Sequence, residues 1–496
     1  MKNKNIVMTK EIEQKMEADP NFQPLETFEK LHDTKPGDMS RRQLLATGII
    51  PFAASIAAPS FISALAASSA SAASELDCKK VSAAPLCPIL NMSLAGGAPL
   101  GGEWLPRDKG QQLLTSYSLM GGGKSPSVDS EFKKDTNGKQ ATFFAGSAFL
   151  TGVRSVASQE TLLQTHFIGV PCRAQDDSQM NKQGLGGMVM AAGRSGDLMK
   201  ILGQNRSATG ATNQPAMVTP PSPLVVNSQN DINGALGFNG TLDSLSDDQQ
   251  AKMMRTIAGL ASHQATNLVS QSGGAVLQKL MGCASEENAN LIANQGNLDV
   301  TPLNNARMRT LYNINQNTNQ GSAAFVKASV AYNVLQSKAA YGSLVEGGCD
   351  GHNGTRATMD ARLLQIGMEV GRLIESAVAL QKKLFLYITT DGGMTGPESN
   401  DAGSPWASDR GLMGCGYVIA YDPKQESRAT TTQLGWFVNG QAAGDDTVWG
   451  SDVERWAAVL FINYLSFNNQ LSLLESVIGR KFESNQIDSV RVLFHV

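Results

Sequence analysis

The chain has 496 residues, a formal net charge of −3, only 17% charged residues and 49 glycines. This balance excludes a protein that binds nucleic acid or an anionic membrane mainly through a basic surface. The length beyond an N-terminal leader, about 420 residues, is enough for one large α/β domain or two smaller ones.

An export signal is the clearest feature of the N-terminal region. Arg41 and Arg42 stand before an apolar run over 44–66, as in bacterial twin-arginine signals, and Ala70-Ser71-Ala72 offers a cleavage site of small residues. The run is long enough to span a bilayer, but its prolines and serines favour a leader over an uncleaved anchor. We therefore expect 1–73 to be a disordered polar region plus signal peptide, recognised by the twin-arginine translocase. The mature protein would then be periplasmic or secreted.

The chain after the leader contains all six cysteines and no further apolar run of spanning length. An even number of cysteines in an oxidising compartment permits up to three disulfides. The short loop between Cys78 and Cys87 favours that pair, and the alternative for each cysteine is a buried free thiol. The other cysteines are Cys172, Cys283, Cys349 and Cys415.

The first elements of the mature chain are short strands separated by long loops. The apolar run 88–94 predicts a buried strand that ends in the glycine loop 95–97, and a second strand is expected at 166–170. Residues 204–240, rich in Asn, Gly, Pro and Thr, are typical of a long surface excursion, which contains a strand at 224–226.

Amphipathic helices are expected next. One begins near Ser246, and two more cover 322–339 and 357–383, where leucines and methionines recur at helical spacing. We interpret these apolar stripes as core packing.

The C-terminal third alternates strands and helices. The nearly continuous apolar run 384–390 is typical of a strand buried on both faces of a parallel sheet. Further strands are expected at 416–421, 435–438 and 489–496, a helix from the capping box at Ser451, and a short helix at 468–479. The pattern predicts a single α/β domain over 74–496, with a mostly parallel central sheet flanked by helices.

Acidic residues gather near the expected carboxyl ends of the strands, where α/β proteins bind ligands. Asp391 directly follows an apolar strand, Asp350 and His352 lie in a glycine-rich loop before the long helix, and Asp409 with Arg410 lies in a later loop. Asp and His suit one divalent metal ion, which would polarise an ester oxygen or activate a water.

Plain structural roles for the same residues stay open. Asp391 begins an Asp-Gly-Gly turn in which it could accept backbone hydrogen bonds, and Asp409 could pair with Arg410 or Arg356. A Ser-His-Asp triad is not supported, because no Gly-x-Ser-x-Gly elbow precedes His352.

The order of these motifs resembles that of a known group of proteins. The leader, the first strand ending in Leu94-Ala95-Gly96-Gly97-Ala98, the loop Gly348-Cys349-Asp350-Gly351-His352, the strand ending Thr389-Thr390-Asp391-Gly392 and the loop Ser408-Asp409-Arg410-Gly411 carry the likeness. They resemble a large uncharacterised family of twin-arginine-exported bacterial proteins, distantly related to alkaline phosphatases and sulfatases. The likeness covers most of the mature chain in outline and is specific from about residue 345 to 470.

The resemblance implies an alkaline-phosphatase-like α/β fold with metals bound by an Asp after the first strand and a later Asp-His pair. This chain departs from that pattern, because Gly96 and Gly97 follow the first strand and Arg410 follows Asp409. The expected activity is hydrolysis of a phosphate or sulfate ester with one metal near Asp350, His352 and Asp391. The alternatives are a non-catalytic binding protein of the same fold and a secretion-accessory or carbohydrate-binding protein.

Overall fold

The computed structural model divides the chain into two units, Met1–Ser55 and Ile56–Val496. All residues that the structure describes belong to the second unit, so the expected leader with Arg41 and Arg42 lies outside them. The described residues are 86–114, 143–173, 184–204, 223–235, 299–350, 356–390, 413–438 and 453–496, with single positions at 218, 220, 221, 246, 249, 252, 256 and 444.

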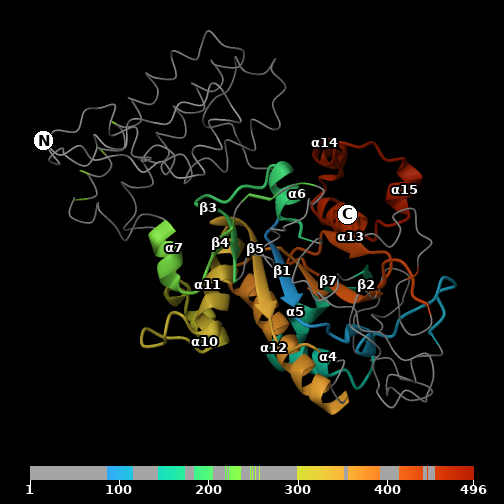
Figure 1. Ribbon diagram of the computed structural model, residues 1–496, viewed down its shortest axis with the longest axis horizontal. Coiled ribbons are helices and arrows are strands. Elements are labelled where there is room, and N and C mark those ends of the chain that lie inside the picture. The colour runs from blue at the N-terminus through green and yellow to red at the C-terminus, as the bar shows by residue number, and fades with distance from the viewer. Residues whose placement is uncertain are drawn as a thin grey trace, which may run out of the picture. The chain divides into compact units, whose positions relative to one another are not determined.

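A seven-stranded sheet forms the centre of the described fold, in the order β2-β7-β6-β1-β5-β3-β4 (Figure 1). The five strands from β6 to β4 are parallel, β7 is antiparallel to β6, and β2 is antiparallel to β7. The mostly parallel α/β sheet expected from the sequence is therefore confirmed. The strands are β1 (Ile89–Leu94), β2 (Thr165–Arg173), β3 (Met199–Gly203), β4 (Leu224–Val225), β5 (Ala339–Glu346), β6 (Leu384–Thr390) and β7 (Met413–Tyr421).

Helices cover both faces of this sheet (Figure 1). One face carries α4 (Ala148–Val156), α11 (Ala323–Leu335) and α12 (Arg356–Ala379), and the other carries α6 (Gly186–Ala191) and α13 (Val453–Phe467). The remaining described elements are α5 (Gln159–Leu163), α7 (Gln229–Ala235), α10 (Ala306–Tyr312), α14 (Leu474–Ile478), α15 (Ser484–Asp488), the 3-10 turns η2 (Leu100–Gly102), η6 (Pro302–Asn304) and η9 (Leu471–Leu473), and a small antiparallel sheet of β8 (Ser427–Ala429) and β9 (Leu493–His495).

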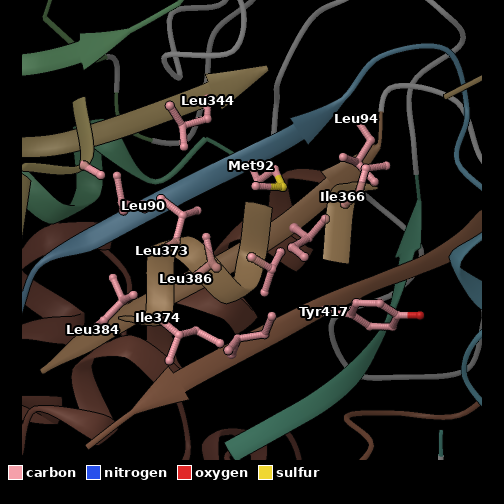
Figure 2. Packing of buried hydrophobic residues seen from close by; sticks show 14 of the residues in the cluster. Leu90, Met92, Leu94, Leu344, Ile366, Leu373, Ile374, Leu384, Leu386 and Tyr417 are labelled. Atoms are coloured by element: carbon pink, nitrogen blue, oxygen red, sulfur yellow. The ribbon is translucent and has the colours of Figure 1, made fainter. Parts of the chain in front are cut away.

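The central strands are buried on both faces because their side chains alternate between two hydrophobic clusters. Leu90, Met92 and Leu94 of β1 point toward α12, as Figure 2 shows, together with alternate residues of β6. Ile89 of β1 and Phe385 of β6 belong to the cluster under α6 and α13. This double burial explains why the run 384–390 is apolar up to its two final threonines.

Helices α4 and α12 cross at unusually close range. A Cβ added at Gly152 would lie 2.1 Å from the carbonyl oxygen of Leu364, and one added at Gly367 would lie 2.0 Å from that of Phe149. Only glycine at these positions lets the two backbones touch. The crossing fixes α4, and with it the segment that follows β1, against the helix that joins β5 to β6.

The strands expected at 88–94, 166–170, 224–226 and 384–390 and the long helix at 357–383 are confirmed within a few residues. The expected helix over 322–339 is confirmed as α11, although it ends at Leu335, and 468–479 contains η9 and α14. Of the helix expected from Ser246, only single positions lie among the described residues.

Several expectations were wrong. Residues 435–438 form no strand of the sheet, since Gly435 adopts a φ of +70° that breaks an extended backbone. The last strand is confined to β9, because a capping box at Glu483 starts α15 just before the expected strand. The excursion over 204–240 also contains α7, and the strands β3 and β5 had not been foreseen.

Three buried cysteines bear on the expected disulfide, and the helices bear on the expected lack of a membrane span in the mature chain. Cys87, Cys349 and Cys415 are buried and form no disulfide, which differs from the expected Cys78–Cys87 disulfide; Cys78 lies outside the described residues. Among the described residues, no helix combines the length and apolarity that a membrane crossing requires.

Candidate functional site

The carboxyl ends of β5, β1 and β6 meet at one edge of the sheet, with β1 in the middle. Leu94, the last residue of β1, pairs in register with Glu346 of β5 on one side and Thr390 of β6 on the other. Neighbouring strands lie about 4.8 Å apart. The loops in which sequence analysis expected ligands therefore start at adjacent positions along this edge.

The loops after β1 and β5 are joined by backbone hydrogen bonds. The amide of Ala95 donates to the carbonyl of Glu346 at 2.9 Å, and the amide of Cys349 donates to the carbonyl of Ala95 at 3.2 Å. The pairing of β1 with β5 thus continues beyond the strands and carries the β5 loop across the end of β1.

Asp350 lies against Gly96 as a result. A Cβ added at Gly96 would lie 2.8 Å from the Cβ of Asp350 and 2.9 Å from its amide nitrogen. Gly96 has a φ of +101°, which L-residues rarely adopt. Asp350, an exposed residue, therefore takes up the space over the end of β1 that a side chain at position 96 would need.

On the other side of β1, the hydroxyl of Thr390 accepts a hydrogen bond from the amide of Ala98 at 3.0 Å. This contact ties the end of β6 to the loop after β1. Asp391 is the next residue in the chain and lies outside the described residues.

The other candidate ligands, His352, Asp391 and Asp409, and the neighbouring Arg410 lie outside the described residues. Their convergence with Asp350 stays a prediction. Within the described part of the chain, no group of three or more His, Cys, Asp or Glu side chains is arranged to hold a metal ion.

A buried charge cluster supports the β5 loop from the α11 and α12 face. Glu346, only 4% exposed, pairs with Lys327 of α11 and with Arg362 of α12, whose Nη2 lies 2.8 Å from a carboxylate oxygen. Arg362 also donates from Nε to the carbonyl of Gly347 at 2.8 Å. Burial disfavours the guanidinium charge, but the hydrogen bond to Glu346 and the electrostatic interactions with Cys349 and Glu346 together outweigh it, so the pKa of Arg362 is raised. Helices α11 and α12 thus hold the last residue of β5, and α12 also holds the first residue of the loop leading to Asp350.

Near their carboxyl ends the same strands carry buried polar side chains on the face under α6, which is otherwise hydrophobic. Asn91 of β1 donates from Nδ2 to the carbonyl of Tyr387 at 3.3 Å and to the hydroxyl of Thr389 at 3.2 Å. It accepts from the hydroxyl of Ser343 at 3.2 Å. Asn91 and Ser343 are fully buried and Thr389 is 4% exposed, so this network links β5, β1 and β6 inside the protein.

Two tyrosines continue the polar face inward. The hydroxyls of Tyr341 and Tyr387 lie 2.6 Å apart, and the amide of Leu185 donates to that of Tyr387 at 3.1 Å. Burial raises the pKa of both tyrosines above their ordinary value, so both stay protonated. They supply neutral hydrogen-bonding groups and no charge.

Sequence analysis named Asp350 from its glycine-rich loop, without the strand β5 that precedes it, and did not identify the roles of Glu346, Asn91 or Thr389. A polar residue such as Asn91 inside an otherwise apolar strand was the available signal, since buried polar groups need partners. The partner Ser343 could not be named, because β5 was not recognised as a strand.

Comparison of the chain with protein-family models, with curated proteins and with solved structures finds no match. What the fold and the strand edge define is a class: an α/β protein whose loops gather beyond the carboxyl ends of three parallel central strands.

Proposed function

We propose that this chain is an exported, alkaline-phosphatase-like protein that binds one divalent metal ion and hydrolyses a phosphate or sulfate ester. The metal ligands would be Asp350, His352 and Asp391, with Asp409 as a fourth. The observation that supports this proposal is the contact between Asp350 and Gly96, which brings one carboxylate over the middle strand of the edge from which the chain continues to Asp391.

The chemistry of the proposed ligands fits this assignment. Carboxylate oxygens and an imidazole nitrogen bind zinc, manganese or, for oxygen ligands, calcium at about 2.0–2.6 Å. The metal would polarise an ester oxygen or lower the pKa of a bound water. The motifs that resemble the alkaline phosphatase and sulfatase superfamily point to the same substrates.

Metal analysis and turnover test the proposal together. The full-length protein is dialysed and its metal content measured, and activity is then assayed on aryl phosphates and aryl sulfates with zinc, manganese or calcium. We expect about one metal per chain and metal-dependent turnover, both lost in Asp350→Asn and Asp391→Asn. Asp488→Asn, an exposed carboxylate at the end of α15, is the matched control and should keep both. Metal-free protein without turnover would rule the enzyme out.

A non-catalytic binding protein on the same fold is the second candidate. It is favoured by Gly96, because the loop after β1 has no room for the carboxylate that the resembled enzymes place after their first strand. On this proposal the edge still binds a ligand, but no ester panel shows turnover. A protein that binds metal stoichiometrically and turns over no ester would support it.

A separate proposal, export from the cytoplasm, rests on the sequence alone. The pair Arg41 and Arg42 before the apolar run supports recognition by the twin-arginine translocase and a periplasmic or secreted location. The double change Arg41→Lys and Arg42→Lys should retain the protein in the cytoplasm on cell fractionation. Unchanged export of this variant would contradict the assignment.

A further inference from the structure

The three central strands are buried along their whole length except at one pair of neighbouring residues, which lies on the side of the sheet that α6 covers. All six positions of β1 are buried except Ser93, all eight of β5 except Val345, and all seven of β6. Ser93 and Val345 are register partners and are partly exposed. Solvent therefore reaches the middle of the sheet at this pair, one step from its carboxyl edge.

Val345 lines this opening on the β5 side, and hydroxyl-bearing residues line it on β1 and β6. Ser93 is also the register partner of Thr389 on β6, and both side chains project to the face that carries Asn91, because residues two apart share a face. Adjacent strands bring the two hydroxyls to about 5 Å from each other. Asn91 lies two residues before Ser93 on the same face of β1, and its side-chain amide already forms hydrogen bonds with neighbouring strands.

Two hydroxyl groups beside this opening, those of Thr389 and Ser93, donate no hydrogen bond to any described residue. The hydroxyl of Thr389 accepts from Asn91, but its own proton has no acceptor among the described residues, although Thr389 is only 4% exposed. Ser93 makes no side-chain hydrogen bond to any described residue. A buried donor without a partner is costly, so the proton of Thr389 is best satisfied by an acceptor that enters beside the partly exposed Ser93.

We propose that Ser93 and Thr389 form an oxyanion subsite that holds phosphate or sulfate oxygens by two neutral hydroxyl donors. Hydroxyls about 5 Å apart can each donate at about 2.7 Å to oxygens of one tetrahedral anion. The subsite deepens the proposed function, because these anions are the groups in the proposed substrates and products. It is distinct from the proposed metal site, since neither residue is a metal ligand candidate.

The test is binding of inorganic phosphate and of inorganic sulfate to the full-length protein in excess EDTA, followed by calorimetry. We expect binding without metal, weakened about three- to tenfold by Ser93→Ala and by Thr389→Val. Thr389→Ser, which keeps the hydroxyl, should bind as the unaltered protein does. Thr310→Val, which removes an exposed hydroxyl on α10, should also leave binding unchanged. Circular dichroism and thermal unfolding confirm that each variant is folded.

The outcomes separate this inference from the proposed enzyme. Phosphate or sulfate binding in EDTA that falls in both hydroxyl variants supports the subsite, even if no ester is hydrolysed. Binding that requires metal and is unchanged in both variants overturns the subsite while leaving the metal site standing. Absence of binding of both anions at millimolar concentration also overturns it. The anion bound more tightly identifies the substrate class.

Discussion

Gly96 is the residue that allows the loops after β1 and β5 to meet, and its replacement gives the sharpest test of that arrangement. A φ of +101° lies outside the small left-handed region open to L-residues, so holding alanine there costs about 2 kcal/mol. The new Cβ would also lie 2.9 Å from the amide nitrogen of Asp350, which is backbone and must shift. We predict that Gly96→Ala destabilises the protein by about 3 kcal/mol in total.

Alanine substitutions at two nearby glycines distinguish the cost of backbone strain from the cost of steric overlap with Asp350. Gly348 has a φ of +69°, but a Cβ there would meet only the Nε of Arg362 at 3.9 Å, so Gly348→Ala should cost about 1 kcal/mol from backbone strain alone. Gly347 has no positive φ and no atom within 4 Å of an added Cβ. Gly347→Ala should therefore lie between no change and about 1 kcal/mol of stabilisation, since alanine restricts the unfolded chain.

Urea unfolding of the three variants gives the free energies, and metal content after dialysis gives the effect on the proposed site. The expected order of destabilisation is Gly96, then Gly348, with Gly347 neutral or stabilised. Gly96→Ala should also lower metal content, because Asp350 must move. Equal stability of the Gly96 and Gly347 variants would refute the close contact between the two loops, and with it the position of Asp350 over β1.

Three further predictions concern the surrounding fold. Lys327→Met removes one partner of the buried Glu346 and should cost about 2–3 kcal/mol in urea unfolding, whereas Lys424→Met, at an exposed pair, should cost less than about 0.5 kcal/mol. Asn463→Ala leaves the buried amides of residues 492 and 493 and the carbonyl of residue 490 without their hydrogen-bond partner. It should lower the free energy of unfolding by about 3 kcal/mol and speed proteolysis of the C-terminal segment. Burial raises the pKa of the Cys87 thiol from its ordinary 9.0 to about 11, so the folded state keeps a proton that the unfolded state loses. Stability from this group is present below pH 9 and should fall by up to about 3 kcal/mol as the pH rises to 11, a slope that Cys87→Ala removes in pH-dependent unfolding.

The elements that sequence analysis found share a strong local signal. The run 384–390 is nearly continuously apolar and bounded by charges and glycines, and the helix over 357–383 has a clear apolar stripe, so both could be recognised without their neighbours. Strand β5 could not, because Ala339, Gly342 and Ser343 give it little β propensity. It is a strand because β1 and β3 pair with it on both sides, which is tertiary context.

The same limit applied to the candidate site. Asp391 was singled out because it follows a recognised strand, and ligands gather beyond the carboxyl ends of parallel strands. Asp350 was grouped with it only because its glycine-rich loop precedes the helix that leads into that strand. The contact with Gly96 was not foreseen, since it depends on β5 lying next to β1. Glu346 was passed over for the same reason: its partners Lys327 and Arg362 come from two helices distant in sequence, and only the fold brings them together.

The proposed subsite and the proposed metal site would contribute differently to the binding of one anion. Ser93, Thr389 and their neighbour Asn91 are neutral, so they can orient an oxyanion but offset little of its charge. A divalent ion held by carboxylates of the adjoining loops would supply that charge. If both sites act on one anion, metal should tighten phosphate binding, and phosphate should tighten metal binding by the same factor, because coupling between two ligands is reciprocal. Titrating each with and without the other measures that factor; a value of one would mean that the two sites do not share a ligand.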